Sequence, residues 1–148
     1  MSLEKWLEYG WLKREPSSPN EIQGLLGIVQ RSLDDAKVEA ISDDLRFIAA
    51  FTAALTVATV ALRASGFRTA TQAGHHVKTI ESLELTLQAE PGLVQTLKTF
   101  NSKRNKSFYD MAGAVTEQEL RQMIKLATEL QRQVKDWVNL THPELLKG

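Results

Sequence analysis

The stretch from Leu45 to Leu62 (LRFIAAFTAALTVATVAL) constrains the fold most, because its 18 residues carry a single charge, that of Arg46. This length is at the lower limit for a transmembrane helix. Three threonines and six alanines make the stretch only mildly hydrophobic, and no aromatic belt flanks it. Small side chains let neighbouring helices approach closely. We therefore predict a central buried helix of a bundle, and no membrane span.

The rest of the chain shows the 3.6-residue apolar periodicity of helices that bury one face. It predicts helices over about 3–14, 19–37, 43–64, 71–87, 91–111 and 117–140. No strand pattern, repeat or domain boundary is evident. The predicted fold is all-α: an antiparallel up-and-down helical bundle of four to five main helices plus a short N-terminal helix. The single domain 1–148 divides into a docking helix (1–15), the bundle (18–140) and a tail (141–148).

Helix-capping patterns support several of these boundaries. Ser18 and Glu21 fit a capping box with Pro19 at the first helical position. Thr116 and Glu119 fit a second capping box. These patterns predict where two of the long helices begin.

Composition excludes several classes of function. The 18 basic and 18 acidic residues cancel, so any nucleic-acid contact must use a local patch. The absence of cysteine excludes disulfides and thiolate chemistry, and it suits the cytoplasm, where we expect the protein. No HExxH, Walker or GxGxxG motif is present.

The segment Lys103-Arg104-Asn105-Lys106-Ser107-Phe108-Tyr109-Asp110 stands apart from this bland scaffold. It combines cations, an amide, a phenol and a carboxylate near the end of one helix. Cations bind phosphates and aromatic rings stack on bases, so the segment suits a flexible RNA strand or a nucleotide. The same residues also fit a surface ion-pair cluster in front of an aromatic core.

Helical spacing adds a constraint on this segment. Arg104 continues the apolar stripe of its helix, and a buried guanidinium needs a carboxylate, a polar cleft or a subunit interface. Arg104 and Tyr109 lie about 140° apart around a regular helix. They share a pocket only if the helix bends or another helix or subunit completes the site. Asn105 and Tyr109, four residues apart, share a face.

His75 and His76 are the other candidates for a site. Neighbouring helical residues diverge, so the two imidazoles make a poor metal pair, and we expect neither a metal nor a cofactor. A structural or surface role and a contribution to a ligand pocket both remain open, because imidazole titrates near neutral pH.

Several motifs together resemble the HEPN superfamily of small helical "higher eukaryotes and prokaryotes nucleotide-binding" domains, over nearly the whole chain. They are the LEKWL…GWL start (3–12), AFTAAL (50–55), ASGFR (64–68), GHH (74–76) and KRN…YD (103–110). The resemblance implies a helical bundle that forms a homodimer. It also implies a role in bacterial toxin–antitoxin or defence systems, with RNA as a ligand and a nucleotidyltransferase-type antitoxin as a possible partner.

The HEPN active motif has an arginine, a polar residue and a histidine four to six positions after the arginine. Arg104 and Asn105 match the first part, whereas Tyr109 takes the place of the histidine. A phenol with a pKa of about 10 is a poor base at neutral pH.

Three functions stay open. The first is an RNA- or nucleotide-binding protein that uses Arg104–Asp110, with Lys103, Lys106, Phe108, His75 and His76 as ligand contacts. The second is a metal-independent endoribonuclease that uses Arg104, Asn105, Tyr109 and Asp110. The third is a non-catalytic adaptor for a protein partner.

Overall fold

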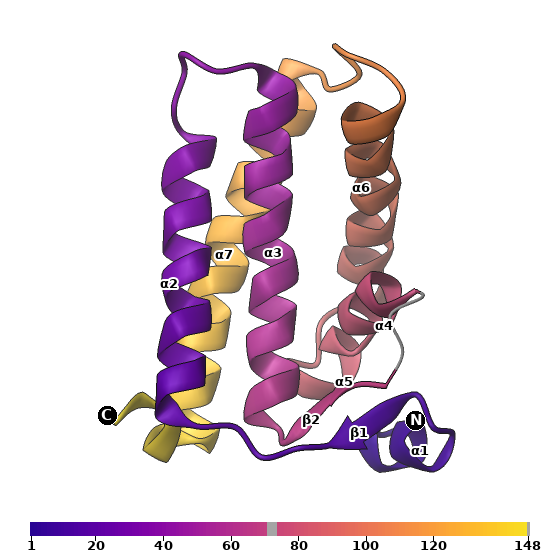
Figure 1. Ribbon diagram of the computed structural model, residues 1–148, viewed down its shortest axis with the longest axis vertical. Helices are drawn as coiled ribbons and strands as arrows, with labels where there is room; N and C mark the ends of the chain where they lie inside the picture. Colours follow the sequence, from indigo (N-terminus) through magenta and orange to yellow (C-terminus); the bar gives the residue numbers. More distant parts are fainter. Residues whose placement is uncertain (71–73, 148) are drawn as a thin grey trace.

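A computed structural model describes residues 1–70 and 74–147, and the side chain of Phe108 lies outside this description. The chain folds as an all-α helical bundle, as the sequence predicts. Figure 1 shows its long helices running alternately up and down, with both chain ends at the same end of the bundle. These helices are α2 (Pro19–Ala36), α3 (Asp43–Ala64), α6 (Pro91–Tyr109) and α7 (Glu117–Thr141).

Helix α3 is the centre of the bundle, as its apolar sequence predicts. It packs most extensively against α2 and α7, and it also contacts α6. The rings of Phe47 on α3 and Phe100 on α6 meet edge to face, with centroids 5.3 Å apart. Among the described helices, α3 alone is long and apolar enough to cross a membrane, with a mean hydropathy of 1.9. However, 56% of its apolar window is buried inside the protein, which fits the core helix of a soluble bundle.

The N-terminal segment differs from the prediction of one helix over 3–14. Helix α1 (Leu3–Glu8) ends early, and the chain turns at Gly10, whose φ of +78° favours glycine. Strand β1 (Leu12–Arg14) then pairs antiparallel with β2 (Phe67–Thr69). Three-residue strands are too short to show the alternation of polar and apolar residues by which strands are recognised in a sequence.

Aromatic packing docks this N-terminal segment onto the end of the bundle. Trp6 and Leu12 are buried together with Leu62 of α3. The ammonium of Lys78 lies 3.7 Å from the ring centroid of Trp11, a cation–π contact. The sequence predicted a docking helix that includes Trp11, but Trp11 lies in the turn after α1 and not on the helix.

The predicted helix over 71–87 is two short helices, α4 (His75–Glu81) and α5 (Leu83–Thr86). The predicted start at Thr71 lies outside the described residues. Between α4 and α5, the buried Ser82 donates its hydroxyl hydrogen to the carbonyl oxygen of Thr79 at 2.6 Å. This kind of local side-chain bond competes with regular helix.

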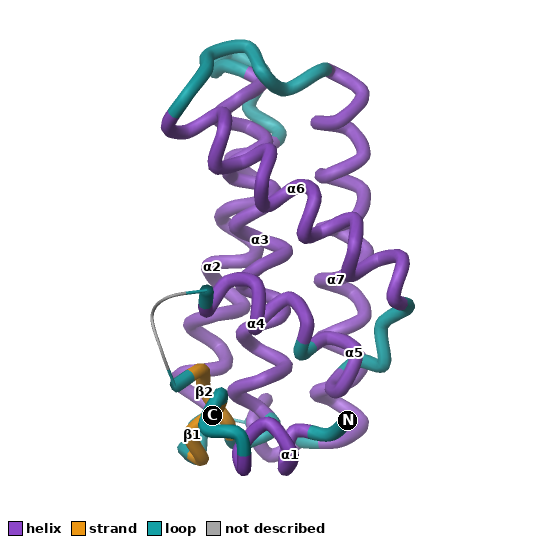
Figure 2. The backbone as a smooth tube through the Cα atoms, turned by 90° about the vertical axis from the view of Figure 1, so that its right-hand side faces the viewer, coloured by secondary structure: helices purple, strands orange, loops and turns teal. Residues whose placement is uncertain are grey.

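The C-terminal tail begins close to the boundary that the sequence predicts. Helix α7 stops at Thr141, and Pro143–Leu146 forms a short 3-10 helix, η1. Leu145 of η1 is buried against the bundle. Figure 2 shows that α4 and α5 lie beside the lower half of α6, with no element of the described chain covering the same side of α6 above them.

Capping is confirmed at α7 and only half confirmed at α2. Thr116 and Glu119 form the complete reciprocal capping box. Ser18 accepts a hydrogen bond from the backbone N–H of Glu21, as predicted. The Glu21 carboxylate does not complete that box, because it binds Arg63 of α3.

Arg63 is a buried charged residue, with only 7% of its surface exposed, and its guanidinium therefore requires hydrogen-bond partners inside the protein. Its guanidinium binds both carboxylate oxygens of Glu21, at 2.8 and 3.2 Å. It also donates to the backbone carbonyl oxygens of Glu15 at 2.8 Å, Phe67 at 3.1 Å and Pro16 at 3.3 Å. We call these five residues the Arg63 cluster. It joins the start of α2 and the end of α3 to the chain that follows β1 and to the first residue of β2.

Replacing Arg63 with methionine should destabilise the protein by about 2 to 4 kcal/mol, because three backbone carbonyls lose their hydrogen-bond donor and the partly exposed Glu21 loses its ion pair. Urea unfolding of the two proteins measures the difference. Arg14→Met is a matched control, since Arg14 makes an exposed ion pair with Glu4. Equal losses in both variants would contradict a special role of Arg63.

The same cluster predicts a pH dependence. The hydrogen bond from Arg63 lowers the pKa of Glu21 below its usual 4.5, against the opposing effect of burial. The unfolded chain therefore binds the proton more readily than the folded one. The stabilisation is complete above the unfolded pKa and is lost as the pH falls through the lower folded pKa. Glu21→Gln should flatten the acid limb of the stability–pH curve.

Candidate functional site

The C-terminal half of α6 places the predicted motif on two sides of an unbroken helix. Arg104 is half-buried on the inner side, and its Nη1–H donates to the Asn105 Oδ1 at 3.1 Å. Lys106 is exposed, and Tyr109 is 71% exposed. The helix continues without a break to Tyr109, so the divergence of Arg104 and Tyr109 that the spacing predicted is present in the structure.

Lys103 of the predicted motif and Lys98, about one turn before it on α6, are engaged in the fold. The ammonium of Lys98 binds Glu81 of α4 at 2.7 Å. Lys103 donates to the carbonyl oxygen of Ala114 at 3.0 Å and lies 3.4 Å from a carboxylate oxygen of Glu119. Both lysines thus hold neighbouring elements onto α6, and the positive patch around the motif is weaker than its sequence indicates.

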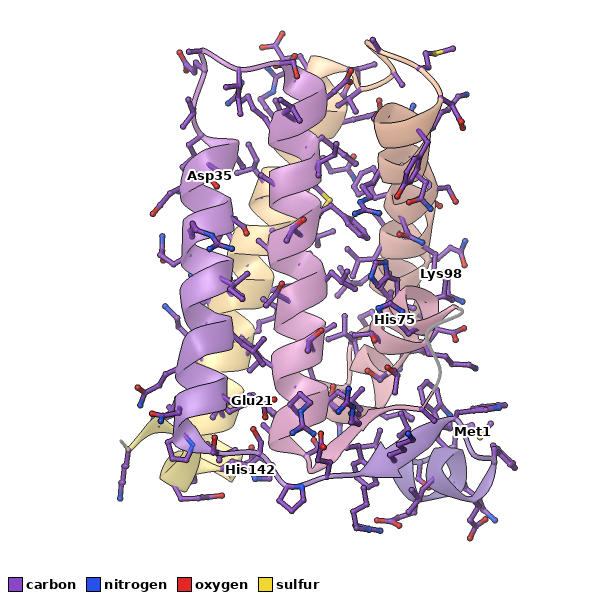
Figure 3. The ribbon with its side chains drawn as sticks, viewed as in Figure 1. Met1, Glu21, Asp35, His75, Lys98 and His142 are labelled. Atoms are coloured by element: carbon purple, nitrogen blue, oxygen red, sulfur yellow. The ribbon has the colours of Figure 1, made fainter. Side chains whose placement is uncertain are left out.

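The Lys98–Glu81 pair sets the register between α4 and α6. The chain descends through α4 and rises through α6 (Figure 1). From this pair, His76 lies about 7.5 Å back along α4, and Arg104 lies about 9 Å further along α6. Going back along the descending α4 and going forward along the rising α6 both mean moving up the bundle, so the two residues lie on the same side of the Lys98–Glu81 pair. Figure 3 shows His75, the residue before His76, on α4 next to α6.

Electrostatics agrees with this placement of His76. The ring centroids of His75 and His76 are 4.2 Å apart. Burial lowers the pKa of His76 below 6.5, and the charges of His75 and Arg104 lower it further. His76 is therefore held in its neutral form near pH 7, within the field of Arg104. A neutral imidazole can accept a proton or a hydrogen bond from a ligand.

Polar atoms on the inner side of α6 flank Arg104. Asn101 Oδ1 and Ser107 Oγ are buried, and neither has a hydrogen-bond partner within the described chain. These residues lie three positions before and three after Arg104, so all three side chains are close together on one face. A buried polar atom without a partner costs about 1 to 3 kcal/mol. The arrangement suits a water molecule or a polar ligand between α6 and its neighbours.

The other part of the motif belongs to a different surface. Tyr109 and Asp110 line a hollow of about 500 Å³ between the start of α3 and the end of α6. We call this hollow the end groove, and its lining is Ser42, Asp44, Leu45, Ile48, Ser107, Tyr109, Asp110, Met111 and Ala112. Arg104 is not part of this lining. The structure thus separates Arg104 and Asn105 from Tyr109 and Asp110.

Two contacts near the site are not predicted by the sequence. Asp44 resembles an acid placed to favour the helix dipole, yet its carboxylate accepts hydrogen bonds from Gly113 and Val115. The register that aligns His76 with Arg104 depends on the Lys98–Glu81 pair, which joins residues 17 apart in the chain. No local pattern gives either contact.

The remaining predictions concern metals and Phe108. No group of three or more His, Cys, Asp or Glu side chains in the described residues is arranged to hold a metal ion. The Phe108 side chain, an expected ligand contact, lies outside the described structure. Comparison of the chain with protein-family models, curated proteins and solved structures finds no match.

Removing the charge of Arg104 should raise the pKa of His76, since that charge opposes protonation of the imidazole. NMR titration of the ring protons in wild type and Arg104→Gln measures the shift. Lys106→Gln is the matched control, because Lys106 projects from the exposed side of α6. Equal His76 titration curves in wild type and Arg104→Gln would place Arg104 too far away to act on His76.

Proposed function

We propose that this chain is a HEPN-type protein that binds RNA or a nucleotide through the C-terminal half of α6, in a bacterial toxin–antitoxin or defence system. The observation that carries the proposal is the position of Arg104 on α6 between the buried oxygens of Asn101 and Ser107, with His76 within the range of its charge. A guanidinium with polar groups around it is the arrangement that phosphate and ribose require.

Each residue around Arg104 has a specific role in the proposed binding. Arg104 binds a phosphate, and the exposed Lys106 adds a second positive charge further around the helix. Asn105 holds the guanidinium by accepting its hydrogen bond. The His75–His76 ring pair offers an aromatic surface next to the phosphate site. Sequence-independent binding of a single strand uses this combination of cation and ring.

The partners follow from the same resemblance. We expect a homodimer and an antitoxin of the nucleotidyltransferase type. Arg104 is half-buried and not fully enclosed, so part of its side chain is left for contact with a ligand or a second subunit.

Arg104→Ala should weaken binding of a fluorescein-labelled single-stranded RNA roughly tenfold, measured by fluorescence anisotropy. Loss of one phosphate contact should also reduce the slope of log affinity against log salt by about 0.7. The matched control is Arg121→Ala, which removes an exposed arginine of α7 that pairs with Glu117. Equal loss in both variants would indicate a non-specific charge effect. Absence of RNA and nucleotide binding in wild type would leave the adaptor function.

The placement of His76 also favours a second candidate, a metal-independent endoribonuclease. In this reaction the neutral imidazole takes the proton of a ribose 2′-hydroxyl, and the oxygen attacks the adjacent phosphorus. The bond to the 5′-oxygen breaks, that oxygen takes a proton from a water molecule, and a 2′,3′-cyclic phosphate forms. Arg104 stabilises the charge that develops on the phosphate oxygens. His76 would thus supply the base that Tyr109 cannot.

Cleavage of RNA in EDTA separates the two candidates. The endoribonuclease should leave 2′,3′-cyclic phosphate ends, and His76→Gln should reduce the cleavage rate about a hundredfold or more, a far larger loss than its effect on RNA affinity. His142→Gln is the matched control, because His142 packs on Trp137 at the other end of the bundle. Binding of RNA without cleavage in wild type would exclude the enzyme and leave the binding protein.

A further inference from the structure

The end groove carries an exposed apolar surface that the RNA site does not use. Leu45 is 54% exposed, Met111 is 53% exposed and Tyr109 is 71% exposed. All three line the groove. The connections from α2 to α3 and from α6 to α7 both lie at this end of the bundle (Figure 1). Exposed apolar side chains that gather around one hollow mark an interaction surface.

Hydrogen bonds fix the shape of this groove. The Asp44 carboxylate of α3 accepts the backbone N–H of Gly113 at 2.6 Å and that of Val115 at 3.3 Å. Gly113 has a φ of +76°, a conformation that favours glycine. Lys103 binds the carbonyl oxygen of Ala114 from the α6 side. The connection after α6 is therefore tied to both helices, and the groove needs little rearrangement to accept a ligand.

The charge of the groove selects among possible ligands. Asp44 and Asp110 are the charged residues of its lining, and both are acidic. Within the described residues, no cationic side chain forms an ion pair with either of them. RNA phosphates would be repelled here. A second copy of the chain that docked groove to groove would bring like charges together, which is unfavourable.

We propose that the end groove binds a segment of a partner protein that presents apolar side chains on one face and lysine or arginine at its edge. The apolar side chains cover Leu45, Ile48 and Met111, and the cation pairs with Asp110. This is the mode in which an amphipathic helix lies in an apolar groove. The proposal does not rest on the RNA site: Arg104 is not part of the groove lining, and Ser107 is the residue that borders both surfaces.

A short fluorescein-labelled Leu–Lys amphipathic peptide and its Leu–Glu counterpart are the probes. The Leu–Lys peptide should bind wild type, and the Leu–Glu peptide should not. Leu45→Ser and Asp110→Lys should each weaken binding of the Leu–Lys peptide roughly tenfold. Leu140→Ser is the matched control, since Leu140 is an exposed leucine on α7, 82% exposed. Thermal unfolding verifies that each variant folds, and RNA affinity should be unchanged in Leu45→Ser.

Three results would overturn the proposal. Equal binding of both peptides would show non-specific apolar adsorption. Equal affinity of Leu45→Ser and Leu140→Ser would place the peptide elsewhere. A wild-type dimer in light scattering that Leu45→Ser converts to monomer would make a second copy the occupant. Loss of RNA binding alone, in Arg104→Ala, leaves this proposal intact and concerns only the function proposed above.

Discussion

The buried guanidinium of Arg63 is the constraint on which much of the structure depends. A charge that is almost wholly removed from water must be paired and hydrogen-bonded, and Arg63 finds its partners in Glu21 and in three backbone carbonyls. Two of those carbonyls, from Glu15 and Pro16, belong to the chain between β1 and α2. Satisfying one side chain therefore fixes the start of α2 and the path of the N-terminal segment. That segment in turn holds α4 through Trp11 and Lys78.

The position of the candidate site follows from how the apolar surface is distributed. Helix α3 is buried on most of its circumference by α2 and α7, and α6 covers part of the remainder. The inner face of α6 is apolar at Leu97 and Phe100 and becomes polar from Asn101 onward. Helix α4 is too short to cover this upper part of α6 (Figure 2). Polar side chains thus occur where the apolar core ends. At this position they can bind a ligand without the large cost of burying them in the core.

The sequence predicts the fold better than the site because the two depend on contacts of different range. Periodicity and caps are local, so the long helices and the starts at Ser18 and Thr116 are correctly predicted. The strand pair, the break at Ser82 and the use of Glu21 by Arg63 depend on residues distant in the chain. For the site, spacing correctly separated Arg104 from Tyr109. Which side chains from other helices join each of them is a tertiary property.

The separation of Arg104 from Tyr109 changes what the motif can do. In a straight helix, five residues place two side chains about 140° apart, so one segment presents two surfaces of different charge. Arg104 lies near uncharged buried oxygens and within the range of its charge from His76, whereas Tyr109 and Asp110 border an acidic, apolar groove. An anionic ligand is favoured on the first surface and disfavoured on the second. Lys103 fixes the connection after α6 through its bonds to Ala114 and Glu119. Ser107 borders both surfaces, so a nucleic-acid strand and a protein segment would come closest to each other at this residue.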